Sequence, residues 1–177
     1  VYVGLVTGTC FAETGNQVIC IDIDADKVEK MKNGIIPIYE PNLDTIFERN
    51  ITAKRLSFTT SLEDGIKDAE IIFLALPTPP GEDGSADLSY ILGVAEQLGK
   101  LITDYKVIVD KSTVPVGTAE KVHTVIAKNA QVDFAVVSNP EFLREGFAVE
   151  DFMKPERVVV GTSSEKAKKL MEELYQP

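Results

Sequence analysis

Short apolar runs alternate along this chain with longer stretches in which apolar residues recur at helical spacing. Continuous apolar runs are typical of strands buried on both faces of a sheet, and the longer period is typical of amphipathic helices. The predicted strands are residues 18–23, 57–59, 71–76, 106–110, 134–137 and 157–160. The predicted helices are residues 7–13, 24–33, 40–49, 61–67, 88–101, 117–129 and 164–175.

This alternation predicts an α/β fold, a doubly wound and mostly parallel sheet of the Rossmann type with helices on both faces. A chain of 177 residues is of ordinary length for one domain, and we expect residues 1–177 to form a single one. The first strand of such a fold has no counterpart in this sequence. We therefore expect the chain to be a fragment of a longer protein.

Composition excludes several classes of partner. The net charge of −10 argues against binding nucleic acid or an anionic membrane surface. No apolar run is long enough to span a bilayer, and no signal peptide is visible. With one histidine and no Cys-x-x-Cys pair, we expect no metal site. Cys10 and Cys20 are most simply buried free thiols, and His123 a solvated or partly packed helix residue.

The start of the chain matches the second half of a dinucleotide-binding β-α-β unit. Gly4 occupies the place of the third glycine of the G-x-G-x-x-G fingerprint, and Gly8 keeps the same helix face narrow. Asp22 ends the next strand, where a carboxylate accepts both hydroxyls of an adenosine ribose. Because an acid repels a 2′-phosphate, NAD is favoured over NADP. The alternative is a doubly wound domain whose second strand merely ends in an acid.

Two further loops follow predicted strands at the edge where open α/β sheets bind ligands. Prolines around Thr78 hold its hydroxyl in place, although a rigid turn explains them equally well. Ser112 and Thr113 precede a predicted helix, so helix capping is the alternative for them. Lys27 follows Asp22 closely enough to reach an adenosine ribose or phosphate, but a surface helix position is the default.

The segment SNPEFLREG, residues 138–146, combines a strand end with two acids. Glu141 and Glu145 are four residues apart and share one face if a helical turn starts after Pro140, with Arg144 offsetting their repulsion. A carboxylate pair at a strand end suits acid/base chemistry. The alternative is the first turn of a helix, whose positive end favours acids.

Taken together, these residues resemble the N-terminal NAD-binding domain of UDP-glucose 6-dehydrogenases. Their family also includes GDP-mannose and UDP-N-acetyl-mannosamine dehydrogenases. The resemblance covers essentially the whole chain. The motifs that carry it are YVGLVTG (2–8), DID (22–24) with Lys27, PTP (77–79), KSTVPVGT (111–118), NPEFLREG (139–146), DF (151–152) with Pro155, and RVVVG (157–161).

The resemblance implies an oxidoreductase that oxidises UDP-glucose to UDP-glucuronate in two NAD-dependent steps through a cysteine thioester. The positions that match NAD contacts are Gly4, Asp22, Lys27, Thr78, Thr113 and Glu145. The positions that match the catalytic residues are Thr113 and Glu141, which handle the water and its proton, and Glu145. The positions that match the substrate-binding loop are Glu141, Phe142, Leu143 and Arg144.

The family's cysteine nucleophile, central dimer helix and UDP-binding domain match nothing in these residues, and neither Cys10 nor Cys20 takes the nucleophile's place. We therefore expect the chain by itself to show no turnover. The resemblance implies a cytoplasmic enzyme that forms a homodimer or a higher homo-oligomer. Two alternatives stay open: another sugar-nucleotide dehydrogenase of the same family, acting on GDP-mannose or UDP-N-acetyl-mannosamine, and a non-catalytic nucleotide-binding module.

Overall fold

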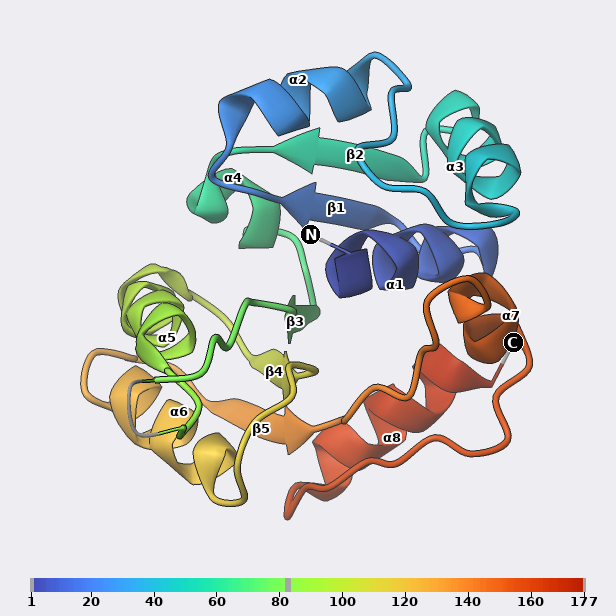
Figure 1. The fold of residues 1–177 in the computed structure, drawn as a ribbon. Helices are drawn as coiled ribbons and strands as arrows, with labels where there is room; N and C mark the ends of the chain where they lie inside the picture. The colour runs from blue at the N-terminus through green and yellow to red at the C-terminus, as the bar shows by residue number, and fades with distance from the viewer. Residues whose placement is uncertain (1, 82–83, 177) are drawn as a thin grey trace. The chain divides into compact units, whose positions relative to one another are not determined.

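The computed structural model describes residues 2–81 and 84–176. The chain forms two compact units. The first contains residues 1–65 and 142–157, and the second contains residues 66–141 and 158–177. Each unit contains a sheet whose strands pair in parallel (Figure 1). This pairing confirms the predicted α/β fold.

The first unit is built on a two-stranded sheet, in which β1 (Val18–Ile21) pairs with β2 (Leu56–Thr59). Its described helices are α1 (Tyr2–Glu13), α2 (Ala25–Lys32), α3 (Leu43–Thr52), α7 (Ala148–Met153) and, at the boundary with the second unit, α4 (Leu62–Ile66). The rings of Phe11 on α1 and Phe152 on α7 meet edge to face, with centroids 4.9 Å apart. The late helix α7 is therefore packed on the first helix of the chain.

Gly8 allows α1 to lie close to β1. A Cβ at this position would come within 2.8 Å of the Cys20 sulfur and 3.4 Å of a Val18 methyl carbon, so even alanine would collide with the strand. This contact confirms the predicted narrow helix face. On other sides of α1, Leu5 and Ala12 join a buried cluster with Phe47 of α3 and Phe58 of β2.

The second unit contains a three-stranded sheet in the order β3 (Ile71–Leu74), β4 (Lys106–Asp110), β5 (Phe134–Ser138). Its described helices are α5 (Ser89–Leu101), α6 (Thr118–Ala127) and α8 (Glu165–Tyr175). Val107 and Val109 pack with Met171 of α8, while α5 and α6 lie on the opposite face of this sheet (Figure 1). Every residue of β4 is buried, including the charged residues Lys106 and Asp110 at its two ends.

Two predicted elements differ in the structure. The strand predicted at 157–160 is absent, because Val158 and Val159 lie at the surface and only Gly161 bridges to Ser138 at the end of β5. The helix predicted from Glu40 begins instead at Leu43, because Asn42 takes a left-handed conformation with φ 66°. Most other predicted elements are present with ends shifted by a few residues.

Candidate active site

In the second unit, Thr78, Thr113 and Glu141 all lie beyond the carboxyl ends of parallel strands, the edge at which such sheets bind ligands. Asp22 lies at the corresponding end of β1 in the first unit. The remaining predicted site residues, Gly4, Lys27 and residues 142–145, also belong to the first unit. The structure therefore places these residues in two groups, and each group has its own local geometry.

Asp22 keeps a carboxylate oxygen available for a ligand. Its backbone N–H donates to the Thr59 carbonyl at 3.2 Å, so the ladder with β2 extends to this residue. Its Oδ1 accepts the N–H of Asp24 at 2.9 Å, which is the only hydrogen bond to this carboxylate from the described residues. The side chain is half-buried. An oriented carboxylate with spare acceptor capacity fits the hydroxyls of an adenosine ribose.

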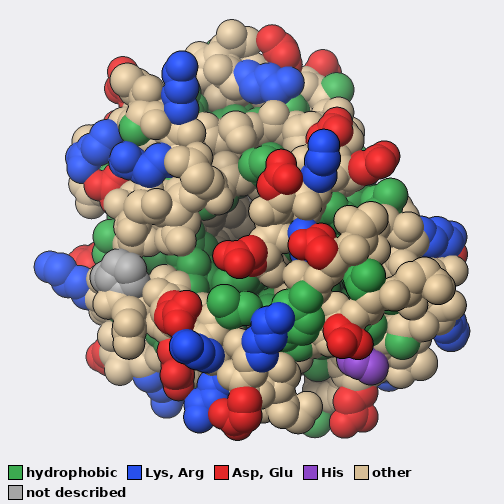
Figure 2. Space-filling model, turned by 180° about the vertical axis from the view of Figure 1, so that it is seen from behind, with side chains coloured by type: hydrophobic (Ala, Val, Ile, Leu, Met, Phe, Trp, Pro, Cys, Tyr) green, Lys and Arg blue, Asp and Glu red, His purple; other side chains and the backbone are tan. Residues whose placement is uncertain are grey.

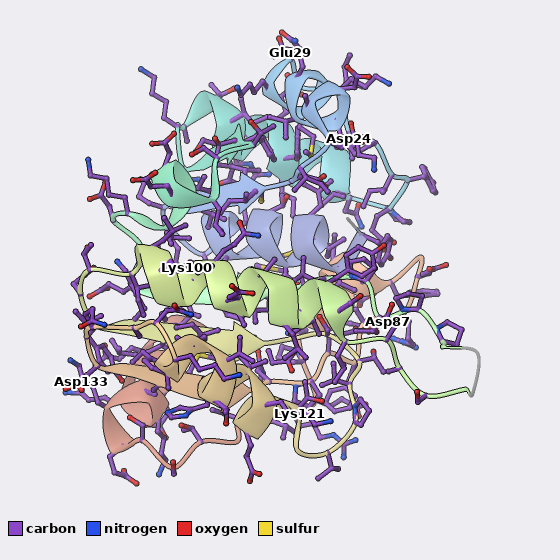
Figure 3. The ribbon with its side chains drawn as sticks, turned by 90° about the vertical axis from the view of Figure 1, so that its left-hand side faces the viewer. Asp24, Glu29, Asp87, Lys100, Lys121 and Asp133 are labelled. Carbon is purple, nitrogen blue, oxygen red and sulfur yellow. The ribbon has the colours of Figure 1, made fainter. Side chains whose placement is uncertain are left out.

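Lys27 forms an ion pair with Asp24, the residue that precedes α2 and that Figure 3 labels. Asp24 accepts the Lys27 N–H at 3.1 Å as a helix cap, and the Lys27 ammonium lies 3.2 Å from its other oxygen. These contacts hold the pKa of Asp24 below its usual value. Gly4 lies in the first turn of α1 and is half-buried.

Hydrogen bonds made by side-chain hydroxyl groups connect the loops after β3 and β4. Thr78 donates through Oγ1 to the Thr113 carbonyl at 2.9 Å, so two predicted cofactor contacts do lie together. The buried Ser112 hydroxyl accepts the Leu76 N–H at 3.0 Å and lies 3.1 Å from the carbonyls of Leu74 and Leu76. The capping alternative for Ser112 and Thr113 is wrong, because α6 begins only at Thr118.

Asp110 is an acid at a strand end that sequence reasoning did not single out. It is 2% exposed, and its Oδ1 accepts the Ser112 N–H at 3.2 Å. Its Oδ2 has no hydrogen-bond partner within the described parts of the chain. Burial raises the pKa of this carboxyl to about 6. The signal in the sequence is its position at the end of the run that becomes the central strand.

The charge of Glu141 acts on a buried cation. Lys111 is 4% exposed, and its burial lowers the pKa of its ammonium to about 8, while the charge of Glu141 acts in the opposite direction. The Lys111 nitrogen is 3.4 Å from both the Asn139 side-chain oxygen and the Tyr175 hydroxyl. The sequence places Lys111 in a motif, but its burial emerges only from the fold.

Asn139 fixes the backbone just before Glu141. Its amide donates to the Val159 carbonyl at 2.8 Å, its side-chain oxygen accepts the Tyr175 hydroxyl at 2.6 Å, and its backbone N–H donates to the Asp110 carbonyl at 2.9 Å. Glu141 itself is half-buried. These anchors give Glu141 a defined position at the end of β5.

The helical turn predicted over Glu141 and Glu145 is wrong. Residues 139–144 have no regular structure, residues 145–147 form a turn, and α7 starts only at Ala148. The two acids therefore do not share a helix face, and they belong to different units. The alternative that both are acids of a helix first turn is equally wrong.

Residues 142–145 form a largely exposed segment of the first unit. The Phe142 ring lies under the Arg157 guanidinium, 5.1 Å from centroid to carbon, while Leu143 packs against a buried cluster. Arg144 makes two side-chain hydrogen bonds to Asp151, at 3.0 and 2.6 Å, and these hold the pKa of Asp151 at about 2. Glu145 is exposed.

Other candidate chemistry is absent from the described part of the chain. No group of His, Cys, Asp and Glu side chains there could hold a metal ion, and none of its helices is long and apolar enough to cross a bilayer. Cys10 and Cys20 are unpaired, and burial raises the pKa of the Cys10 thiol to about 12. Its thiol is protonated at neutral pH, which makes it a poor nucleophile.

His123, the single histidine, is at the surface, as Figure 2 shows. Its ring packs against that of Phe134 at a tilt of 32°, with the ring centroids 4.8 Å apart. This placement agrees with the solvated or partly packed reading. Acidic and basic side chains are interspersed on the face seen in Figure 2. A hollow near Tyr105 and Asp133 lies at the amino ends of β4 and β5, away from the edge where such sheets bind ligands.

Comparison with known proteins shows to which family the chain belongs. The model of the NAD binding domain of the UDP-glucose/GDP-mannose dehydrogenase family matches residues 1–177. The chain belongs to this family. NAD is accordingly its cofactor, and the half-exposed Asp22 carboxylate beside the close α1–β1 packing fits that cofactor.

Members of the family resemble the chain closely. The UDP-glucose 6-dehydrogenase TuaD of Bacillus subtilis is 51% identical over 178 residues, which cover 99% of this chain and 39% of that protein. The structure of a UDP-glucose dehydrogenase from Pyrobaculum islandicum matches with a TM-score of 0.96 and 41% identity, over 99% of this chain and 42% of that one. A GDP-mannose dehydrogenase from Pseudomonas aeruginosa matches with a TM-score of 0.94 and 33% identity, over the same shares. The chain thus spans about two fifths of these relatives.

Proposed function

We propose that this domain belongs to an NAD-dependent UDP-glucose 6-dehydrogenase. The observation that carries the proposal is the 51% identity to a UDP-glucose 6-dehydrogenase across 99% of the chain. Overall, the primary alcohol of the sugar becomes a carboxylate: UDP-glucose, two NAD⁺ and water give UDP-glucuronate, two NADH and three protons. When bound, NAD accepts a hydride in each of the two oxidations.

The chain's own residues supply binding and proton transfer in this proposal. Asp22 accepts the ribose hydroxyls, and Thr78 and Thr113 line the cofactor at the carboxyl ends of β3 and β4. Lys27 and Gly4 complete the cofactor contacts, with Lys27 reaching the ribose from the start of α2. This assignment makes the first unit the source of nucleoside recognition.

Glu141 is the proposed base in the hydrolytic step. Its carboxylate takes the proton from the attacking water, Thr113 orients that water, and the buried Lys111 interacts electrostatically with the acid whose charge changes. Glu145 contacts the cofactor or the sugar nucleotide, while residues 142–144 line the sugar and its diphosphate. The cysteine that forms the thioester belongs to the part of the family's sequence that this chain does not match.

Glu141→Gln in the full-length protein tests the role of Glu141. Removal of a general base is expected to lower turnover by roughly a hundredfold or more. The dissociation constant for NAD should stay nearly unchanged, because Glu141 is not assigned to the cofactor. Glu120→Gln, an exposed acid in the first turn of α6, is the matched control. Unchanged turnover in Glu141→Gln would contradict the assignment.

The structural match to a GDP-mannose dehydrogenase supports a second candidate substrate. Initial rates with UDP-glucose and GDP-mannose at equal concentrations separate the two candidates. The proposed enzyme is cytoplasmic and forms a homodimer or a higher homo-oligomer, which sedimentation of the full-length protein can check.

A further inference from the structure

Glu40 is a buried acid on the segment between α2 and α3, and it is 5% exposed. Its carboxylate accepts three hydrogen bonds from residues far away in the sequence. The Tyr2 hydroxyl and the Gly146 N–H both donate to Oε2, the latter at 2.9 Å. The Ala148 N–H donates to Oε1 at 2.8 Å.

These donors offset the cost of burying a charge. Burial alone raises the pKa of Glu40, but the hydrogen bonds from Tyr2, Gly146 and Ala148 outweigh it and hold the pKa below its usual value. No lysine or arginine within the described residues forms an ion pair with Glu40. A buried carboxylate without a cation is stable only when hydrogen bonds satisfy it.

Glu40 fixes the turn that leads into α7. The N-cap residue Phe147 provides no side-chain acceptor, and Gly146 adopts φ +87°. The first helical N–H, that of Ala148, is satisfied by Glu40 instead. A remote carboxylate thus does what a local Ser or Asp does at most helix starts, and the conformation of residues 145–147 depends on it.

The same carboxylate also holds the first turn of α1. Tyr2 and Gly146 share the Oε2 atom, so the start of α1 and the turn after Glu145 are tied to one point. The start of α1 carries Gly4, which matches the third glycine of the dinucleotide-binding fingerprint, and residues 142–144 belong to the proposed substrate loop. Asp151 fastens this loop a second time, because its carboxylate accepts the backbone N–H of Arg144 at 3.0 Å as well as its guanidinium.

We infer that Glu40 is a positioning residue: by fixing the turn at residues 145–147, it holds the neighbouring residues 142–144 of the proposed substrate loop in their binding conformation relative to the start of α1. This inference rests on the proposed function. Glu40 touches neither substrate nor cofactor in this account. It acts by fixing the backbone beyond Glu145, so that binding does not have to order the loop.

Glu40→Gln in the full-length protein tests the inference. The amide retains the size of the side chain but replaces one acceptor oxygen with a donor, which leaves at least one of the three N–H or O–H groups unsatisfied. The KM for UDP-glucose is expected to rise about ten- to a hundredfold, while kcat changes by less than about threefold. A loss of fold alone lowers the amount of active enzyme and leaves KM unchanged.

Glu13→Gln is the matched control. Glu13 is also an acid of the first unit, and it accepts hydrogen bonds from Arg49 and Asn50, both at 2.6 Å, away from the loop. Both variants should lower the melting temperature, but only Glu40→Gln should raise KM. Equal KM values in Glu40→Gln and the wild type would overturn the inference.

Tyr2→Phe keeps the test decisive if Glu40→Gln does not fold. It removes one donor and leaves the bonds to Gly146 and Ala148, so a smaller rise in KM is expected, and an unchanged KM would overturn the inference. Turnover of the two sugar nucleotides by the wild-type protein distinguishes a failure of this inference from a failure of the proposed function. Turnover of GDP-mannose instead of UDP-glucose would overturn the proposed substrate, and the same KM comparison would then be made with GDP-mannose. Turnover of neither would remove both proposals.

Discussion

Asp22 and Asp110 are two acids with the same local structure and different surroundings. Each is at the carboxyl end of a parallel strand, and each accepts the N–H of the residue two positions later, at 2.9 Å for Asp22 and 3.2 Å for Asp110. Asp22 follows β1, a strand with one described neighbour, and is half-buried. Asp110 ends β4, which has strands on both sides, and is 2% exposed.

This difference shows that position in the sheet decides what a strand-end acid can do. The central strand places Asp110 in a setting that penalises its charge, and its free oxygen has no partner in the described residues. The Asp22 carboxylate keeps contact with solvent and can accept ligand hydroxyls. This contrast supports the proposal that Asp22 binds the cofactor, while Asp110 is part of the buried core of the fold.

The largest expected effect concerns Asp110, whose ionisation should make the unfolding free energy of the protein depend on pH. Its pKa rises from the ordinary 3.8 to about 6 in the folded state. The native protein thus binds more protons than the unfolded chain between these values, and stability falls as pH rises through this window. The shift corresponds to about 3 kcal/mol of unfolding free energy.

Asp110→Asn removes this titration. Relative to the wild type, the variant should gain up to about 3 kcal/mol between pH 4 and pH 7, because the amide has no charge to bury. Urea unfolding at a series of pH values measures the difference. Parallel stability curves for the two proteins would mean that Asp110 is not buried as an acid.

A smaller effect is expected at Asp22. Asp22→Asn weakens hydrogen bonds between a charged acceptor and ribose hydroxyls, so the dissociation constant for NAD should rise about ten- to a hundredfold. The ratio of the dissociation constants for NADP and NAD should fall as well, because Asn no longer repels the 2′-phosphate of NADP. Calorimetry on the full-length protein checks both, with Asp110→Asn as the control that retains NAD affinity. Equal dissociation constants for NAD in Asp22→Asn and the wild type would contradict the proposed difference in role between Asp22 and Asp110.

The sequence predicts those parts of the fold that depend on local pattern. The strand predicted at 106–110 becomes β4 residue for residue, and the helices predicted from residues 24 and 164 begin within one residue of those positions, at Ala25 and Glu165. The run 157–160 looks like a strand equally well, but no neighbouring strand pairs with it over that length. Strand formation depends on such a neighbour, which a local pattern does not reveal.

Residues 141–147 show the same limit at the site. Charges four residues apart suit a helix, yet two acids elsewhere in the chain decide the backbone there. Glu40 holds Gly146 and Ala148, and Asp151 holds Arg144. The sequence identifies Glu141 as a candidate acid, but the burial of Lys111, on which its charge acts, depends on Asn139 and α8 and cannot be read from spacing.

The number of NADH molecules formed per molecule of sugar nucleotide tests the central claim most directly. With limiting UDP-glucose and excess NAD, the full-length protein should produce two NADH for each UDP-glucose consumed, and UDP-glucuronate as the product. Absorbance of NADH and mass spectrometry of the product give both values. One NADH per UDP-glucose, or none, would contradict the assignment of this domain to a UDP-glucose 6-dehydrogenase.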